Sequence, residues 1–158
     1  CPRRCAAPPE FIWQNERWFG VMALKMALAK YPNAFPYPCG DSELLNAEIL
    51  ALMRSGVKTA TCEAWATFED GTEDLPVADR VDIALDWAGK PALATRTLSV
   101  ERIAFDLMDE PRVAAQGEFR DLAHWRLGYE AYLTRTGRFS PNVDMMFERF
   151  AIIEEFGQ

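Results

Sequence analysis

The sequence predicts one α+β domain, a small curled sheet or barrel flanked by helices. Its 158 residues are enough for one compact core, and 49% hydrophobic with 26% charged residues is typical of a folded globular chain. Some stretches repeat apolar residues every three or four positions, which predicts helices, while others alternate apolar and polar residues, which predicts strands. Because both kinds of stretch are interleaved along the chain, the fold class is α+β.

The N-terminal part is expected to be an extension, with residues 1–38 as an arm and helix and residues 39–158 as the main domain. Residues 1–9 contain three prolines and predict a frayed arm. A helix is predicted over residues 10–30, ending before Tyr31 and Pro32. Its packed side is predicted to carry the apolar residues Phe11, Trp18, Val21, Met22, Met26 and Leu28.

Residues 31–42 contain three prolines and predict an extended connection. Asp41 or Ser42 is expected to cap the next helix, and Gly56 lies just past its end. Leu45, Ile49, Leu52 and Met53 would form its apolar face.

The central part of the chain reads as strands. Residues 58–68 predict a strand that ends in a turn at Asp70 and Gly71. Residues 80–87 alternate and predict a hairpin with residues 92–105. Residues 106–135 return to helical spacing, closed by Gly137, and residues 143–156 predict the last strand.

The net charge and the cysteines limit which functions the protein can have. There are 17 basic and 24 acidic side chains, a net charge of −7, so the overall field repels long polyanions. The four cysteines have no paired metal-ligand spacing and there is a single histidine, so we expect no metal and no cofactor. We expect a cytoplasmic monomer or homodimer without a membrane span, because no apolar run is long enough for one.

Lys58 is the first candidate for chemistry. It follows Gly56 and stands beside Thr59 and Thr61, so it is a candidate amine base or anion ligand. In an ideal strand Lys58 and Thr61 point to opposite faces, so a bulge or turn would be needed to bring them together. The alternative is a solvated lysine at a sheet edge beside strand-forming threonines.

The second candidate is Glu118, which follows Gly117 just before a predicted helix start near Asp121. The alternative is an ordinary surface glutamate near a helix start. His124 and Trp125 lie on that helix. His124 is expected to be a packing or capping group rather than a catalyst, and Trp125 is expected to be in the core.

The third candidate is the loop at residues 134–142. Arg135 and Arg138 flank a glycine turn there, with Ser140 following, and two arginines can clamp a phosphate or carboxylate. The alternative is a solvated loop. The sequence contains none of the common hydrolase, kinase, dehydrogenase or metalloprotease motifs.

Four blocks in order resemble the ASCH domain family of the PUA-like superfamily, found in bacterial proteins: residues 39–65, 74–108, 114–132 and 139–153. The resemblance implies a small β-barrel with flanking helices and a cleft for RNA or a nucleoside. Some bacterial relatives hydrolyse the amide of N(4)-acetylcytidine, and others have been assigned cleavage of single-stranded RNA. The family's catalytic pattern falls on Lys58, Thr61 and Glu118, and more loosely on Ser140.

The resemblance therefore predicts a metal-independent hydrolase of RNA or a modified nucleoside. A neutral Lys58 would take the proton of Thr61, whose hydroxyl then attacks the acetyl carbonyl, and Glu118 would activate water or protonate the leaving nitrogen. Thr59, Arg135, Arg138 and Ser140 would bind the substrate. Two alternatives stay open, a single-stranded ribonuclease and a non-catalytic RNA- or nucleotide-binding module.

Overall fold

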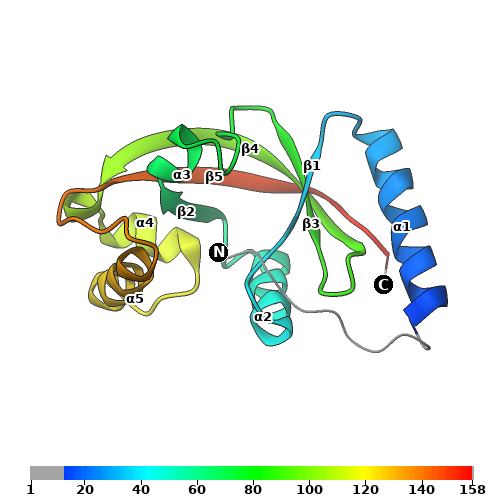
Figure 1. Cartoon of the computed structure of the whole chain (residues 1–158), viewed down its shortest axis with the longest axis horizontal. Helices are drawn as coiled ribbons and strands as arrows, with labels where there is room; N and C mark the ends of the chain where they lie inside the picture. The colour runs from blue at the N-terminus through cyan, green and yellow to red at the C-terminus, as the bar shows by residue number, and fades with distance from the viewer. Residues whose placement is uncertain (1–12, 158) are drawn as a thin grey trace. The chain divides into compact units, whose positions relative to one another are not determined.

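The computed structural model describes residues 13–157, and the predicted arm at residues 1–9 lies outside them. The chain divides into two compact units. Figure 1 labels the α-helices and the strands. Unit 1 contains the chain up to Arg54, then Asp79–Arg96 and the segment from Ala151 onward. Unit 2 contains Ser55–Ala78 and Thr97–Phe150.

The sheet has five strands in the order β1-β3-β4-β5-β2. Two long strands, β4 and β5, each pass from one unit into the other. The strand bounds are Phe35–Pro38 for β1, Ala60–Ala64 for β2, Val81–Leu85 for β3, Pro91–Ala104 for β4 and Asp144–Glu155 for β5. Interleaved helices and strands confirm the α+β prediction.

In unit 1 the first helix, α1 (Trp13–Lys30), ends where predicted, but the prediction of its packed side is wrong. Trp18 and Met26 are 66% and 71% exposed, whereas Gly20 and Ala27 are buried. A Cβ at Gly20 would already lie 3.4 Å from the Lys90 side chain. The close approach of the two segments therefore selects the small residues for the inner side, and the large residues stay outside.

The second helix of unit 1, α2 (Glu43–Arg54), confirms its predicted cap and face. The Ser42 hydroxyl accepts a hydrogen bond from the Leu45 N–H at 3.2 Å, and Ile49 and Met53 are buried. Asn46, also buried, donates to the carbonyls of Cys39 and Leu85 and so ties the helix to the ends of β1 and β3.

The β3–β4 hairpin of unit 1 is confirmed, with Asp86 accepting from the Lys90 N–H across the turn at 2.8 Å. The predicted extended connection contains β1, which pairs in parallel with β3. Phe35 of β1, Asp82 of β3 and Thr95 of β4 are partners in register, so they form one row across three strands.

In unit 2, β2 is shorter than the predicted strand over residues 58–68. It pairs antiparallel with β5, and the Trp65 N–H donates to Asp144, the first residue of β5. Because the partner strand begins at Asp144, residues further along find no ladder and form the short helix α3 (Ala66–Glu69) instead.

The predicted helical segment 106–135 is divided into η1 (Phe105–Leu107), α4 (Glu110–Gln116) and α5 (Leu122–Arg135). Asp109 and Asp121 cap the starts of α4 and α5, and Gly117 ends α4 with φ at 76°. These helices pack on β2 and β5 in the core of unit 2. That core includes Ala60, Cys62, Ile103, Phe105, Val113, Trp125, Leu133, Met145 and Phe147.

Candidate functional site

The candidate site lies entirely within unit 2, where the segment leading into β2 meets the end of α4. The Thr59 N–H donates to the Ala115 carbonyl at 2.8 Å, and the Thr59 carbonyl accepts from the Phe150 N–H at 3.1 Å. The chain just before β2 is thereby held between α4 and β5. Lys58, one residue earlier, is fixed next to the end of α4.

Gly117 makes this approach possible. A Cβ there would lie 3.0 Å from the Val57 carbonyl oxygen and 3.1 Å from the Lys58 nitrogen, and the φ of 76° already disfavours a side chain. The left-handed glycine turns the chain out of α4 so that Glu118 comes back toward Lys58. The glycine that the sequence marks as a neighbour of Glu118 is thus the residue that brings the two segments together.

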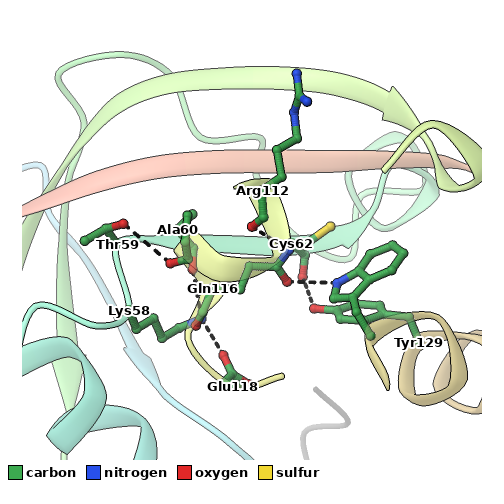
Figure 2. A network of polar contacts seen from close by, with 10 residues as sticks. Lys58, Thr59, Ala60, Cys62, Arg112, Gln116, Glu118 and Tyr129 are labelled. Atoms are coloured by element: carbon green, nitrogen blue, oxygen red, sulfur yellow. Dashed lines mark hydrogen bonds and ion pairs between the residues drawn. The ribbon is translucent and has the colours of Figure 1, made fainter. Parts of the chain in front are cut away.

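Lys58 is buried, with only 6% of its side chain exposed, so the alternative of a solvated edge lysine is wrong. Its Nζ donates to the Ala60 carbonyl at 2.9 Å, to the Gln116 carbonyl at 3.3 Å and to Glu118 Oε1 (Figure 2). A lysine ammonium has three hydrogens and no acceptor site, and three acceptors surround this one. The number of acceptors around Nζ thus equals the number of hydrogens that an ammonium can donate.

Glu118 supplies the opposite charge. One carboxylate oxygen, Oε1, accepts from Lys58, and 28% of the Glu118 side chain is exposed. The other oxygen, Oε2, makes no hydrogen bond to the described residues. Glu118 is therefore anchored on the buried side and open toward solvent, which suits a carboxylate that handles a proton of water or substrate.

Gln116 supports this pair from inside, a role that the sequence does not reveal. It is 1% exposed, accepts from the Trp125 indole N–H at 3.0 Å, and donates to the Arg112 carbonyl at 3.3 Å. The backbone carbonyl of Gln116 accepts from Lys58 at the same time. The predicted core role of Trp125 is confirmed, because it is fully buried.

The structure does not bring Thr61 to Lys58. Thr61 is half-buried on β2, in register with Glu148 of β5, and none of the described hydrogen bonds joins it to Lys58. Burial alternates from Lys58 (buried) through Thr59 (exposed) and Ala60 (buried) to Thr61 (half-buried), which agrees with the opposite parity that the sequence indicates. Thr59 is exposed, and its hydroxyl lies 3.4 Å from the Ala115 carbonyl.

The loop at residues 134–142 is only partly available to bind a substrate. Arg138 donates to the Thr67 hydroxyl at 3.0 Å and to Asp70 at 2.6 Å, so its guanidinium is already occupied. Arg135 is exposed, with its guanidinium 5.9 Å from the centre of the Tyr132 ring. Ser140 donates to Asn142 at 3.3 Å. None of the described contacts joins the three to Lys58 or Glu118.

An aromatic cluster begins at Phe119, the residue that follows Glu118. Phe119 lies 5.7 Å from the Tyr129 ring and 5.5 Å from the His124 ring, and Tyr129 stacks on Trp125 at 4.8 Å. The backbone N–H of His124 donates to Asp121 in the helix cap, and its Nδ1 accepts from the Arg120 N–H. His124 thus packs on Phe119 and caps a backbone N–H, and packing or capping is what the sequence predicts for it.

Tyr129 and Cys62 are held in their neutral forms. The Tyr129 hydroxyl donates to the Cys62 carbonyl at 2.9 Å (Figure 2), and burial raises the pKa of the phenol well above 10. Burial likewise raises the pKa of the Cys62 thiol. Since the thiolate is the nucleophilic form, Cys62 does not serve as a nucleophile near neutral pH.

Within residues 13–157, no group of three or more histidine, cysteine or acidic side chains is arranged to hold a metal ion. In the same part of the chain, no helix has both the length and the apolar character to cross a membrane.

The model of the ASCH domain family matches residues 37–154, which is most of the chain. The chain belongs to the ASCH domain family. Among curated proteins, none is similar enough in sequence to count as a match.

Two solved structures share the fold. Protein EF3133 from Enterococcus faecalis V583 has 24% sequence identity and a TM-score of 0.72, over 86% of this chain and 88% of that one. An ASCH domain from Lactobacillus crispatus JV V101 has 19% identity and a TM-score of 0.68, over 88% of this chain and 94% of that one. The predicted PUA-like fold is thereby confirmed.

Proposed function

We propose that this ASCH domain protein is a hydrolase that cleaves the amide of an acetylated cytidine, free or in RNA, in the cytoplasm. The observation that carries the proposal is the ion pair of a buried lysine with a partly exposed glutamate, Lys58 and Glu118. A fixed carboxylate with one open oxygen can serve as the general acid–base group in hydrolysis.

The proposed chemistry needs one water molecule. Glu118 takes a proton from water while the oxygen of that water adds to the acetyl carbon. This addition gives a tetrahedral oxyanion. Glu118 then delivers that proton to the leaving N4 nitrogen as the carbon–nitrogen bond breaks. The products are cytidine and acetic acid, which keeps the second hydrogen of the water and loses it to solvent as acetate, and Glu118 returns to its carboxylate form.

In this scheme Lys58 positions Glu118, and the Glu118 carboxylate in turn compensates the charge of the buried Lys58. The three acceptors around Nζ argue against the neutral lysine base predicted from the sequence, since an ammonium has no lone pair to receive the Thr61 proton. Direct attack by water therefore replaces attack by Thr61, and Thr61 becomes a residue whose loss should be tolerated.

The two alternatives become outcomes of the same test. A ribonuclease would need cations at the scissile phosphate, but Arg138 is occupied by Asp70 and Lys58 by its three acceptors. A non-catalytic module would bind RNA or nucleoside without turnover. Among residues 13–157, no contact favours either one over the hydrolase.

The test is a turnover screen of the purified chain against N(4)-acetylcytidine and short single-stranded RNA, read by chromatography. Glu118→Gln is expected to lower kcat for acetylcytidine about 10²- to 10⁴-fold, because it removes the acid–base group with little change in shape. Lys58→Met is expected to lose activity as well, and Thr61→Val to keep most of it.

Two matched controls come from exposed positions. Glu130→Gln makes the same change on the exposed surface of α5, and Lys25→Met does so on α1, so both should keep full activity. An unchanged kcat in folded Glu118→Gln protein would refute the proposal. Cleavage of RNA that disappears in Lys58→Met would support the ribonuclease instead, and binding without any turnover would support the module.

A further inference from the structure

The outer side of α1 carries five large apolar side chains that unit 1 leaves exposed. Trp18, Phe19 and Met26 are 66%, 68% and 71% exposed, and Val21 and Met22 are 50% and 39% exposed. These five residues are the outer stripe. In the rest of the described chain, a helix or strand carries at most one exposed large apolar residue. Such a concentration on one element indicates an interaction surface.

The outer stripe and the packed side of α1 lie on opposite sides of the helix. An α-helix turns by about 100° per residue, so Trp18, Met22 and Met26 follow one another along one side. Gly20 and Ala27, which are buried, lie on the other side. The apolar spacing that predicted a packed helix is therefore present, but unit 1 packs against the small residues instead.

The chemistry of this side of α1 favours a second copy of the chain as the partner. The aromatic residues Trp18 and Phe19 lie on its N-terminal half, and Lys25 and Met26 lie on its C-terminal half. In an antiparallel pair centred at Met22, each half would face the opposite half of the other copy. Trp18 would then meet Met26 in a sulfur–aromatic contact, and Phe19 would meet Lys25 in a cation–π contact. A parallel pair would instead oppose the two Lys25 charges.

The exposed area is enough for a dimer interface. Aromatic side chains bury about 150–250 Å² each, so Trp18 and Phe19, each exposed by about two thirds, leave roughly 200–330 Å² open. With the other three residues, the outer stripe offers on the order of 450 Å² per copy, or about 900 Å² for a pair. Since about 65% of a homodimer interface is apolar, this corresponds to about 1,400 Å² in total. Specific interfaces bury about 1,200–2,000 Å².

We propose that α1 is a dimerisation helix, which pairs antiparallel with α1 of a second copy through the outer stripe. A two-fold interface uses the same patch on both subunits, so Met22 lies at the axis and meets Met22 of the other copy. The ASCH family match begins at residue 37, so α1 lies ahead of the matched domain. The interface contains neither Lys58 nor Glu118, and the proposal is independent of the proposed hydrolase.

The test is sedimentation velocity of the full chain between about 1 and 200 μM, because interfaces of this size have micromolar or tighter dissociation constants. The native chain is expected to be a dimer at the upper end of this range. Met22→Glu is expected to weaken dimerisation at least about tenfold, because it opposes two carboxylates at the axis. Leu127→Glu, the matched change at an exposed leucine of α5, should leave dimerisation unchanged.

A native chain that is monomeric at every concentration would overturn the proposal and leave the outer stripe for a different partner. Dimerisation that is unchanged in folded Met22→Glu protein would overturn it as well, since the dimer would then use another surface.

A mixture of two variants tests the antiparallel arrangement. Trp18→Glu and Met26→Lys are each expected to weaken dimerisation at least about tenfold, because each places a charge against an apolar side chain. Antiparallel pairing brings the two new charges together, so an equal mixture should dimerise more tightly than either variant alone. A misfolded variant is not rescued in this way. An equal mixture of folded variants that dimerises no better would overturn the antiparallel pair.

The two proposals fail separately. Met22→Glu should turn over acetylcytidine like the native chain if the proposed hydrolase is correct, and Glu118→Gln should dimerise like the native chain. Loss of dimerisation in Glu118→Gln, with Met22→Glu unaffected, would place the interface in unit 2 and refute the role of α1.

Discussion

Individual residues in this protein are defined by what surrounds them more than by their type. Lys58 is one of only four lysines, and it is buried with three acceptors. Trp18 belongs to a residue type that is usually buried, and it is 66% exposed. Both depart from the usual exposure of their residue types, which is why they carry the two proposals.

Tyr129 offers a test at the same scale that is independent of activity. Because burial raises the pKa of its phenol, the unfolded chain loses this proton first when the pH rises above about 10. The stability present below that pH is therefore lost progressively above it. Tyr129→Phe should lower the free energy of unfolding at neutral pH by about 1–3 kcal/mol, because the Cys62 carbonyl loses its donor.

The measurement is thermal unfolding of the native chain and of Tyr129→Phe between neutral pH and pH 11. The stability of Tyr129→Phe should fall less steeply above pH 10, since only the native chain carries this buried phenol. Parallel curves for the two proteins would contradict the buried, neutral state of Tyr129.

At the scale of elements, the site depends on how α4 ends. Gly117 lets the end of α4 approach Val57 and Lys58, and no other residue type fits that approach without a shift. The packed side of α1 has the same cause, because small residues occupy the side of the helix that comes close to another segment. Close approaches between elements thus decide which residues can stand where.

Gly117→Ala should destabilise the protein by more than the cost of the left-handed backbone alone. Gly137 has a similar φ of 72°, but a Cβ there would meet nothing within 4 Å. Gly137→Ala should therefore cost about 1–2 kcal/mol for the backbone, and Gly117→Ala about 1–3 kcal/mol more for the clash. Denaturant unfolding of both variants measures the difference, and equal losses would show that the contact at Gly117 is not tight.

For the whole molecule, the net charge of −7 sets what kind of nucleic acid the protein can hold. The field repels long strands, while a nucleoside carries no charge to be repelled. The fold is that of the ASCH domain family, and the family by itself does not decide between turnover and binding.

Binding of single-stranded RNA is expected to depend only weakly on salt, because a chain with a net charge of −7 is expected to neutralise few phosphates. Fluorescence anisotropy of a labelled RNA strand between low and moderate salt measures this, with cytidine binding as the uncharged reference. A steep loss of RNA affinity with salt would indicate a long basic track and contradict this expectation.

The sequence by itself determined the fold class, the family and most of the elements of this protein. Those properties depend on local periodicity, caps and ordered motifs, which short stretches of chain carry on their own. It also marked Lys58 and Glu118 as candidates, through the family resemblance. It misjudged the packed side of α1 and the length of β2, because these depend on which segments lie alongside.

Only the tertiary structure decided the state of the candidate residues. Lys58 and Glu118 are sixty positions apart, and their pairing follows from the approach at Gly117, which no local pattern reveals. The separation of Thr61 from Lys58 and the exposure of the outer stripe of α1 were settled in the same way. Burial, charge pairing and hydrogen-bond completion are properties of neighbours in space, and the folded chain sets those neighbours.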